Sequence, residues 1–175
     1  QYMEGQDPVS NTGEADLTIA VKEAFPLRLM ASADNFGTDV IGRNRYTASV
    51  SYANLWGLDH QASYQYVTTS KPEYFQAHGF DYRMPLAWRH YLQFSGHYVL
   101  AQPELLEGLF QQTGESVGAD LRYIVPMRFG QNTGEAYALF SFKESNNNLN
   151  WDPQFNNVQV LSTKTDVFQV TLGGS

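Results

Sequence analysis

GFDYRMP at residues 79–85 and GADLRYIVP at residues 118–126 are two closely similar stretches of this chain. Each stretch places an aspartate two residues before an arginine, sets apolar residues between and around them, and ends at a proline. The two pairs are Asp81 with Arg83, and Asp120 with Arg122. Because side chains alternate between two faces of a β-strand, the acid and the arginine of each pair share a face. The pattern therefore predicts two strands that are charged on one side and apolar on the other.

The composition limits the functions that such strands can have. Charged residues make up only 17% of the 175 residues, whereas aromatic residues make up 14%. Ordinary soluble domains have roughly 25% charged residues. The formal net charge is −7 and no cluster of lysine or arginine is present, which argues against a nucleic-acid partner. Cysteine is absent, so disulfides, thiolate metal sites and cysteine nucleophiles are excluded.

The same alternation recurs from residue 25 onward, in segments separated by Gly, Pro, Asn, Asp or Ser. This arrangement is typical of an antiparallel all-β meander. The predicted strands are residues 25–34, 45–53, 59–68, 75–84, 90–100, 115–125, 134–144 and 166–173. Most are longer than the roughly five to six residues of strands in soluble proteins, and they match the roughly nine to eleven that cross a bilayer. We therefore predict an all-β fold, an antiparallel meander of about eight strands that forms part of a transmembrane β-barrel.

The polar face of these strands carries mainly Ser, Thr, Gln and Gly, as the hydrated interior of a barrel does. An arginine facing lipid near the bilayer midplane costs about 2 to 4 kcal/mol, so the charged residues are expected to point into the lumen. We expect the acids and arginines to pair with each other across neighbouring strands. The candidate lumen charge network is Arg28, Asp81, Arg83, Asp120 and Arg122.

Short and long connections alternate along the chain. Three short links follow the second, fourth and sixth predicted strands, and two of them contain Trp56 and Trp88. Longer links include residues 101–114 and the Asn-rich residues 145–165. Short turns at one rim and long loops at the other are typical of outer-membrane barrels. The two tryptophans then fall where an interfacial aromatic girdle is expected, and the proline after each acid–arginine pair is expected to end strand pairing.

Residues 33–70, followed by GFDYRMPL at 79–86, resemble the start of the barrel in a known family. This family comprises the two-partner secretion transporters of the hemolysin activation/secretion type, which are relatives of the Omp85 outer-membrane insertases. The loop motif of the first barrel hairpin corresponds here to Asp34, Asn35, Gly37, Gly42, Arg43 and Arg45. An N-L-G-D segment at the next turn corresponds to Asn54, Leu55, Gly57 and Asp59.

This resemblance implies a division of the chain and a function. Residues 1–24 would be the end of a periplasmic POTRA-like domain with its linker, and residues 25–175 the first eight or so strands of the barrel. The implied function is translocation of a secreted exoprotein across the outer membrane of a Gram-negative cell, without enzymatic activity or cofactors. Implied partners are the exoprotein and outer-membrane lipid. The family's barrel is larger than eight strands, and the chain ends VTLGGS without a terminal aromatic residue. We therefore expect a fragment with open strand edges and possible self-association through them.

An alternative is a complete eight-stranded small β-barrel that acts as a binding module, closed by pairing of the first and last strands. The four histidines lack the spacing of metal ligands, and DNFGTD at residues 34–39 lacks the spaced acids of a calcium loop. Asp81 with Asp120 or Glu115 could form a glycosidase-like carboxylate pair, but the repeated pairing with arginine favours a structural role. No catalytic, cofactor-binding or metal-binding residue is predicted.

Overall fold

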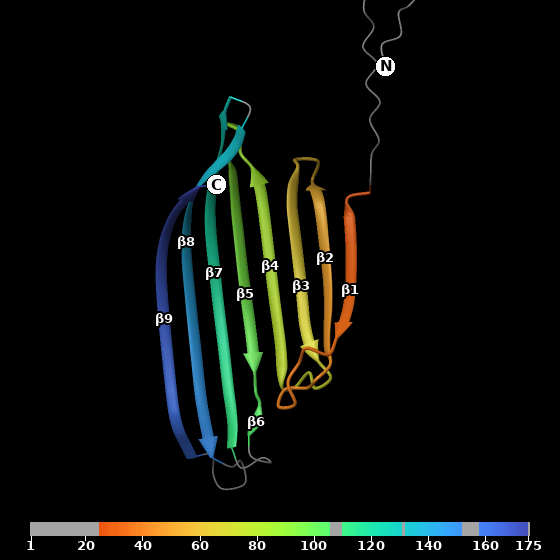
Figure 1. Ribbon diagram of the computed structural model, residues 1–175, viewed down its shortest axis with the longest axis vertical. Helices are drawn as coiled ribbons and strands as arrows, with labels where there is room; N and C mark the ends of the chain where they lie inside the picture. Colours follow the sequence, from red (N-terminus) through yellow and green to blue (C-terminus); the bar gives the residue numbers. More distant parts are fainter. Residues whose placement is uncertain (1–24, 106–109, 131, 152–157, 175) are drawn as a thin grey trace, which may run out of the picture.

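The computed structural model describes residues 25–105, 110–130, 132–151 and 158–174, and residues 1–24, predicted to be POTRA-like, lie outside this part. The strands are β1 (Leu27–Asp34), β2 (Arg45–Leu55), β3 (His60–Thr69), β4 (Phe75–Pro85), β5 (Tyr91–Ala101), β6 (Glu104–Leu105), β7 (Phe110–Phe129), β8 (Asn132–Trp151) and β9 (Val158–Gly174). They form one sheet in the order β1-β2-β3-β4-β5-β7-β8-β9, and β6 pairs with β7 (Figure 1). All of these pairings are antiparallel. The predicted all-β meander is confirmed.

Strands β7, β8 and β9 are much longer than predicted, with 20, 20 and 17 residues. The segments expected to be long loops at 101–114 and 145–165 are largely paired, for example at Thr113 opposite Asn148 and Gly114 opposite Asn147. Asn and Gly are poor strand formers in isolation, but pairing with a neighbouring strand overrides this weak preference. The expected ends of these strands were therefore wrong.

The prolines that follow the two acid–arginine pairs differ in whether strand pairing ends at them. Pro85 is the last residue of β4 and lies opposite Tyr91, as predicted. Pro126 lies opposite Glu135, and β7 continues beyond it to Phe129. The prediction that Pro126 ends pairing was wrong. A proline costs one ladder hydrogen bond, which a long hairpin on both sides of it can tolerate.

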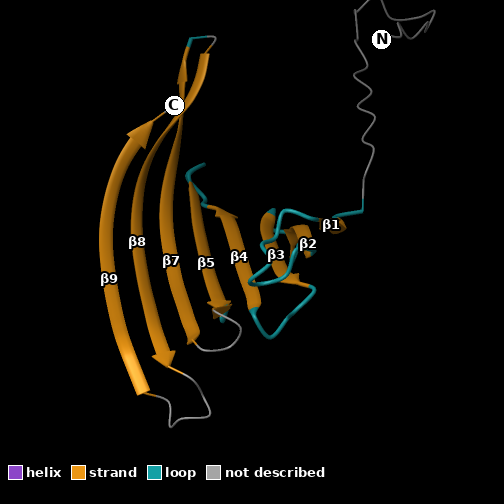
Figure 2. Cartoon of the chain, turned by 60° about the horizontal axis from the view of Figure 1, so that its bottom comes forward, coloured by secondary structure: helices purple, strands orange, loops and turns teal. Residues whose placement is uncertain are grey.

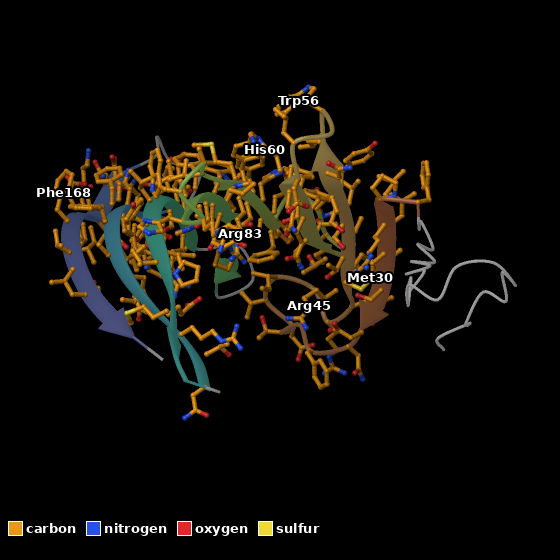
Figure 3. All side chains as sticks on the ribbon, turned by 90° about the horizontal axis from the view of Figure 1, so that it is seen from above. Met30, Arg45, Trp56, His60, Arg83 and Phe168 are labelled. Atoms are coloured by element: carbon orange, nitrogen blue, oxygen red, sulfur yellow. The ribbon has the colours of Figure 1, made fainter. Side chains whose placement is uncertain are left out.

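The sheet is a single curved layer (Figures 2 and 3). Seen from above, Arg83 and Met30 lie on its concave side, whereas Trp56 and Phe168 lie on its convex side (Figure 3). Among the described residues, Ile124 is the one buried apolar side chain, at 2% exposure, and no large side chain is fully buried. The described sheet thus has no second layer and no core of its own.

Large apolar side chains cover the middle of the convex face. Six exposed residues on two adjacent registers form what we call the apolar belt: Tyr64, Phe80, Phe94, Leu121, Phe140 and Phe168. Phe168 is the most exposed of them, at 80%. Full burial of such a side chain is worth roughly 1.5 to 3 kcal/mol, so the belt favours an apolar surrounding over water.

The sheet is open, because β1 and β9 are its two edges and each pairs with one neighbour only. Closure between the first and last strands, which the small-barrel alternative expects, is not present in the described sheet. No helix in the described part of the chain has the length and hydrophobicity that a membrane-spanning helix requires.

Candidate functional site

The concave face carries a continuous row of small polar and charged side chains that crosses seven strands. In successive register positions from β1 to β8 this polar row is Arg28, Ser51, Ser63, Asp81, Ser95, Asp120 and Ser141. Most of its members line shallow grooves on the sheet. Small hydroxyl side chains leave room above the backbone, so the row forms a shallow polar trough.

The next row toward the short turns places Gln61, Arg83, Gln93 and Arg122 side by side. All five residues of the predicted charge network therefore share one face, on two adjacent rows. Their position relative to a barrel lumen stays a prediction.

The expected pairing of these acids with these arginines does not occur among the described residues. Asp81 accepts a hydrogen bond from Gln93 Nε2 at 2.6 Å instead. Asp120 lies one strand beyond Ser95, so about 10 Å separates it from Asp81 along the row. At that separation the two carboxylates interact weakly with each other through water.

Each arginine instead stacks on a tyrosine of the next strand in the sheet. The guanidinium carbon of Arg83 lies 4.1 Å from the ring centroid of Tyr91, and that of Arg122 lies 3.9 Å from the ring centroid of Tyr137. Arg122 also donates a hydrogen bond through its NH2 group to Glu135 Oε1 at 2.8 Å. The repeat in the sequence is thus a structural repeat, with tyrosine rather than aspartate as the shared partner.

The loop motif predicted at the first hairpin folds onto itself. The backbone nitrogen of Gly37 donates to the carbonyl oxygen of Arg43 at 2.9 Å, and Thr38 forms an isolated bridge with Gly42. A Cβ atom on Gly37 would lie 2.7 Å from the Arg43 carbonyl oxygen, so glycine is required there. Arg43 forms an ion pair with Asp39, and its hydrogen bonds lower the pKa of that exposed carboxyl group.

The loop then docks on the end of β3 and the start of the link that follows it. Thr69 is 2% exposed and donates through its hydroxyl to the carbonyl oxygen of Ile41, and Ser70 N donates to Asn44 O at 2.9 Å. Gly42 has φ of +107°, and a Cβ atom there would lie 2.9 Å from Ser70 Oγ. Gly42 therefore allows the close approach of this loop to Thr69 and Ser70, whereas Gly37 allows the loop to fold onto itself.

Asp34 and Arg45 close the base of the same loop. The NH2 and Nε atoms of Arg45 donate to Asp34 Oδ2 at 2.9 and 3.1 Å. Asp34 Oδ1 also accepts from the backbone nitrogen of Phe36 at 3.0 Å. Asn35 is the one member of the predicted motif for which no such contact is seen among the described residues.

Two Trp–His–Tyr clusters lie at the rim of short turns, and only their tryptophans were predicted from the sequence. Trp56 packs edge-on against His60, and Trp88 packs edge-on against His90. The histidines hydrogen-bond to the hydroxyl groups of Tyr82 and Tyr123, respectively. Trp88 Nε1 also donates to Tyr123 at 3.0 Å. A histidine follows each tryptophan within four residues, but the tyrosine comes from the next strand in the sheet in each case.

The turn between β2 and β3 explains the second motif. Asn54 and Asp59 both have positive φ, of 62° and 57°. Asn54 Oδ1 accepts from the backbone nitrogen of Asp59 at 2.9 Å. Asn and Asp tolerate this left-handed conformation better than other residues with a Cβ atom. No group of three or more metal-binding His, Asp or Glu side chains occurs within the described ranges.

Comparisons with known proteins agree with this geometry. The model of the family "Haemolysin secretion/activation protein ShlB/FhaC/HecB" matches residues 13–171. The comparison with curated proteins finds no match. Among solved structures, CdiB from Escherichia coli is similar, with a TM-score of 0.63 at 14% sequence identity. The similarity covers 99% of this chain and 32% of the CdiB chain, so this chain spans less than half the length of that protein. Since the family model covers most of the sequence, the chain belongs to the haemolysin secretion/activation family ShlB/FhaC/HecB.

Proposed function

We propose that this chain forms part of the wall of an outer-membrane barrel that translocates a secreted exoprotein in two-partner secretion. The observation that carries the proposal is the division of one coreless sheet into an apolar convex face and a polar concave face. Family membership supports a role in secretion rather than in catalysis. The convex face would contact outer-membrane lipid, and the concave face would line the path of the exoprotein.

The polar row suits an extended polypeptide in transit. Its hydroxyl groups and carboxylates can exchange hydrogen bonds with a moving backbone, whereas an apolar wall would retain apolar side chains. Asp81 and Asp120 are held apart by Ser95, so their negative charges are spread along the trough. The described part of this surface offers many weak contacts in shallow grooves.

The two edges of the sheet need partners under this proposal. Strands β1 and β9 present unpaired backbone groups, which cost several kcal/mol each in a lipid environment. Further strands of a longer barrel would satisfy them, and residues 1–24 would belong to the preceding POTRA-like domain. When these strands are absent, two copies of the described sheet would associate through the same edges.

Photo-crosslinking at adjacent residues of β5 tests the proposal. A photo-reactive amino acid replaces Ser95 on the concave face or Phe94 on the convex face, in cells that secrete the exoprotein through the full transporter. Crosslinks to the exoprotein are expected from position 95 and not from position 94. Secretion without any crosslink from position 95, or equal crosslinks from both positions, would contradict the proposed path.

A further inference from the structure

Among the described residues, Arg83 on the concave face has no anionic partner. Its guanidinium stacks on Tyr91, yet none of its nitrogens forms a hydrogen bond or ion pair within the described residues. Its Nε atom is buried without an acceptor. The side chain lines a small cavity together with Asp59, Gln61, Pro85 and Tyr91. Figure 3 shows Arg83 on the inner side of the curved sheet.

Arg122, the corresponding arginine of the second repeat, has both a tyrosine and a carboxylate as partners. It stacks on Tyr137 as Arg83 stacks on Tyr91, and its Nε atom likewise lacks an acceptor. The difference is at the terminal nitrogens, because Arg122 NH2 lies 2.8 Å from a carboxylate oxygen of Glu135. One face of the guanidinium is covered by the ring, and its edge binds the carboxylate.

The register identifies why Arg83 lacks this carboxylate. Arg122 lies opposite Leu139, and Tyr137 and Glu135 precede Leu139 by two and four residues. Arg83 lies opposite Gln93, and the residues two and four before Gln93 are Tyr91 and Arg89. The tyrosine is thus retained in both repeats. The residue at the sequence offset of the glutamate is Arg89, which lies in the turn before β5 with φ of 65°, whereas Glu135 is paired within β8. The β4–β5 hairpin ends too early to place a paired carboxylate beside Arg83, and no other described residue forms an ion pair with it.

We propose that Arg83, stacked on Tyr91, binds a carboxylate side chain of a separate polypeptide segment that lies along the concave face. The stacked guanidinium is pre-organised, because the ring restrains its rotation and leaves its donors at one edge. Arg89 adds a second positive charge in the turn that follows β4. Asp59 lines the same cavity but forms no ion pair with Arg83 among the described residues. This inference rests on the repeat geometry and does not depend on the proposed function.

The test uses the full 175-residue chain in detergent micelles, with arginine side chains labelled with nitrogen-15. A hexaglutamate peptide is titrated, and a hexaglutamine peptide is the uncharged control. The Nε–H signal of Arg83 should shift in a saturable manner with hexaglutamate only. Arg83→Gln should weaken binding by about tenfold or more, as loss of a charge-assisted hydrogen-bonded pair implies. Arg128→Gln removes one arginine near the same rim and should retain binding.

Two further variants change the charges near the two stacked arginines. Arg89→Glu reverses the charge of the turn that follows β4 and should weaken the binding of hexaglutamate through repulsion. Glu135→Gln should make Arg122 a second site, so that its signal also responds to hexaglutamate. Circular dichroism checks that each variant is folded. No response of Arg83 to hexaglutamate, or an equal response of Arg83 to hexaglutamine, would overturn the proposal. Binding that appears only in Asp59→Asn would also overturn it, because Asp59 would then be the occupant.

Discussion

Arg83 lies over the ring of Tyr91, with its guanidinium carbon 4.1 Å from the ring centroid. Arg122 and Tyr137 repeat this contact at 3.9 Å in the following hairpin. In both cases the tyrosine belongs to the neighbouring strand, so the contact links two strands across the concave face. An arginine held in this way keeps its charge on the polar face without needing an aspartate of the same strand.

The stack should contribute measurably to stability. We expect Tyr91→Leu to lower the free energy of unfolding in micelles, whereas Tyr91→Phe retains the ring and its interaction with Arg83. In a double-mutant cycle with Arg83→Gln, the coupling energy should be about 0.5 to 1 kcal/mol. Urea unfolding followed by circular dichroism provides the four free energies. A coupling energy indistinguishable from zero would show that the contact is not stabilising.

The two faces of β8 should respond in opposite ways to the same new charge. Phe140 belongs to the apolar belt, and its neighbour Ser141 lies beside Asp120 on the concave face. Phe140→Arg should destabilise the sheet folded in lipid vesicles by about 2 to 4 kcal/mol, whereas Ser141→Arg should destabilise it much less. The two variants place the same charge at adjacent positions of one strand. Equal losses in the two variants would contradict the assignment of the faces.

Gly37 should be essential for the folded loop between β1 and β2. Gly37→Ala should release this loop, because the added methyl group meets the backbone of residues 42 and 43. Faster tryptic cleavage after Arg43 should report this release. Gly79→Ala is the control, since nothing lies within 4 Å of the added Cβ atom there. Unchanged cleavage of Gly37→Ala would show that the loop tolerates a side chain at this position.

The ion pair of Asp39 with Arg43 predicts a pH dependence of the same loop. Hydrogen bonds from Arg43 hold the pKa of Asp39 below its ordinary value of 3.8. Because the folded-state pKa is lowered, the stabilisation is present above the ordinary pKa and is lost as the pH falls through the lowered value. A carbon-13 NMR titration of the Asp39 carboxyl group should show this lowered midpoint, and Arg43→Gln should return it to about the ordinary value. An unchanged midpoint in that variant would contradict the pairing.

Alternation in the sequence was enough to predict most of the fold. The positions of the strands, their antiparallel order and the shared face of Asp81, Arg83, Asp120 and Arg122 all follow from a period of two residues. The ends of β7, β8 and β9 could not be predicted in this way. Their Asn- and Gly-rich segments pair only because a neighbouring strand is available, and sequence propensity does not contain that information.

Contacts between strands were the part of the site that the sequence left undetermined. The partners of Arg83 and Arg122 depend on register, which places Tyr91 and Tyr137 beside them instead of an aspartate. The Trp–His–Tyr clusters have the same origin, since each tyrosine comes from the following strand in the sheet. Register is set by the turns and by pairing along whole strands, so no local motif could reveal these contacts.

The central claim is that the convex face of the sheet contacts lipid while the concave face contacts water. The chain has no cysteine, so single cysteines can be placed at residues 139 to 142 of β8 without further changes. Each variant is labelled with an environment-sensitive dye and refolded into vesicles that contain a lipid-phase quencher. Strong quenching at residues 140 and 142 with weak quenching at 139 and 141 is the result that we predict. Uniform quenching, or folding in plain buffer without association with the vesicles, would contradict the claim.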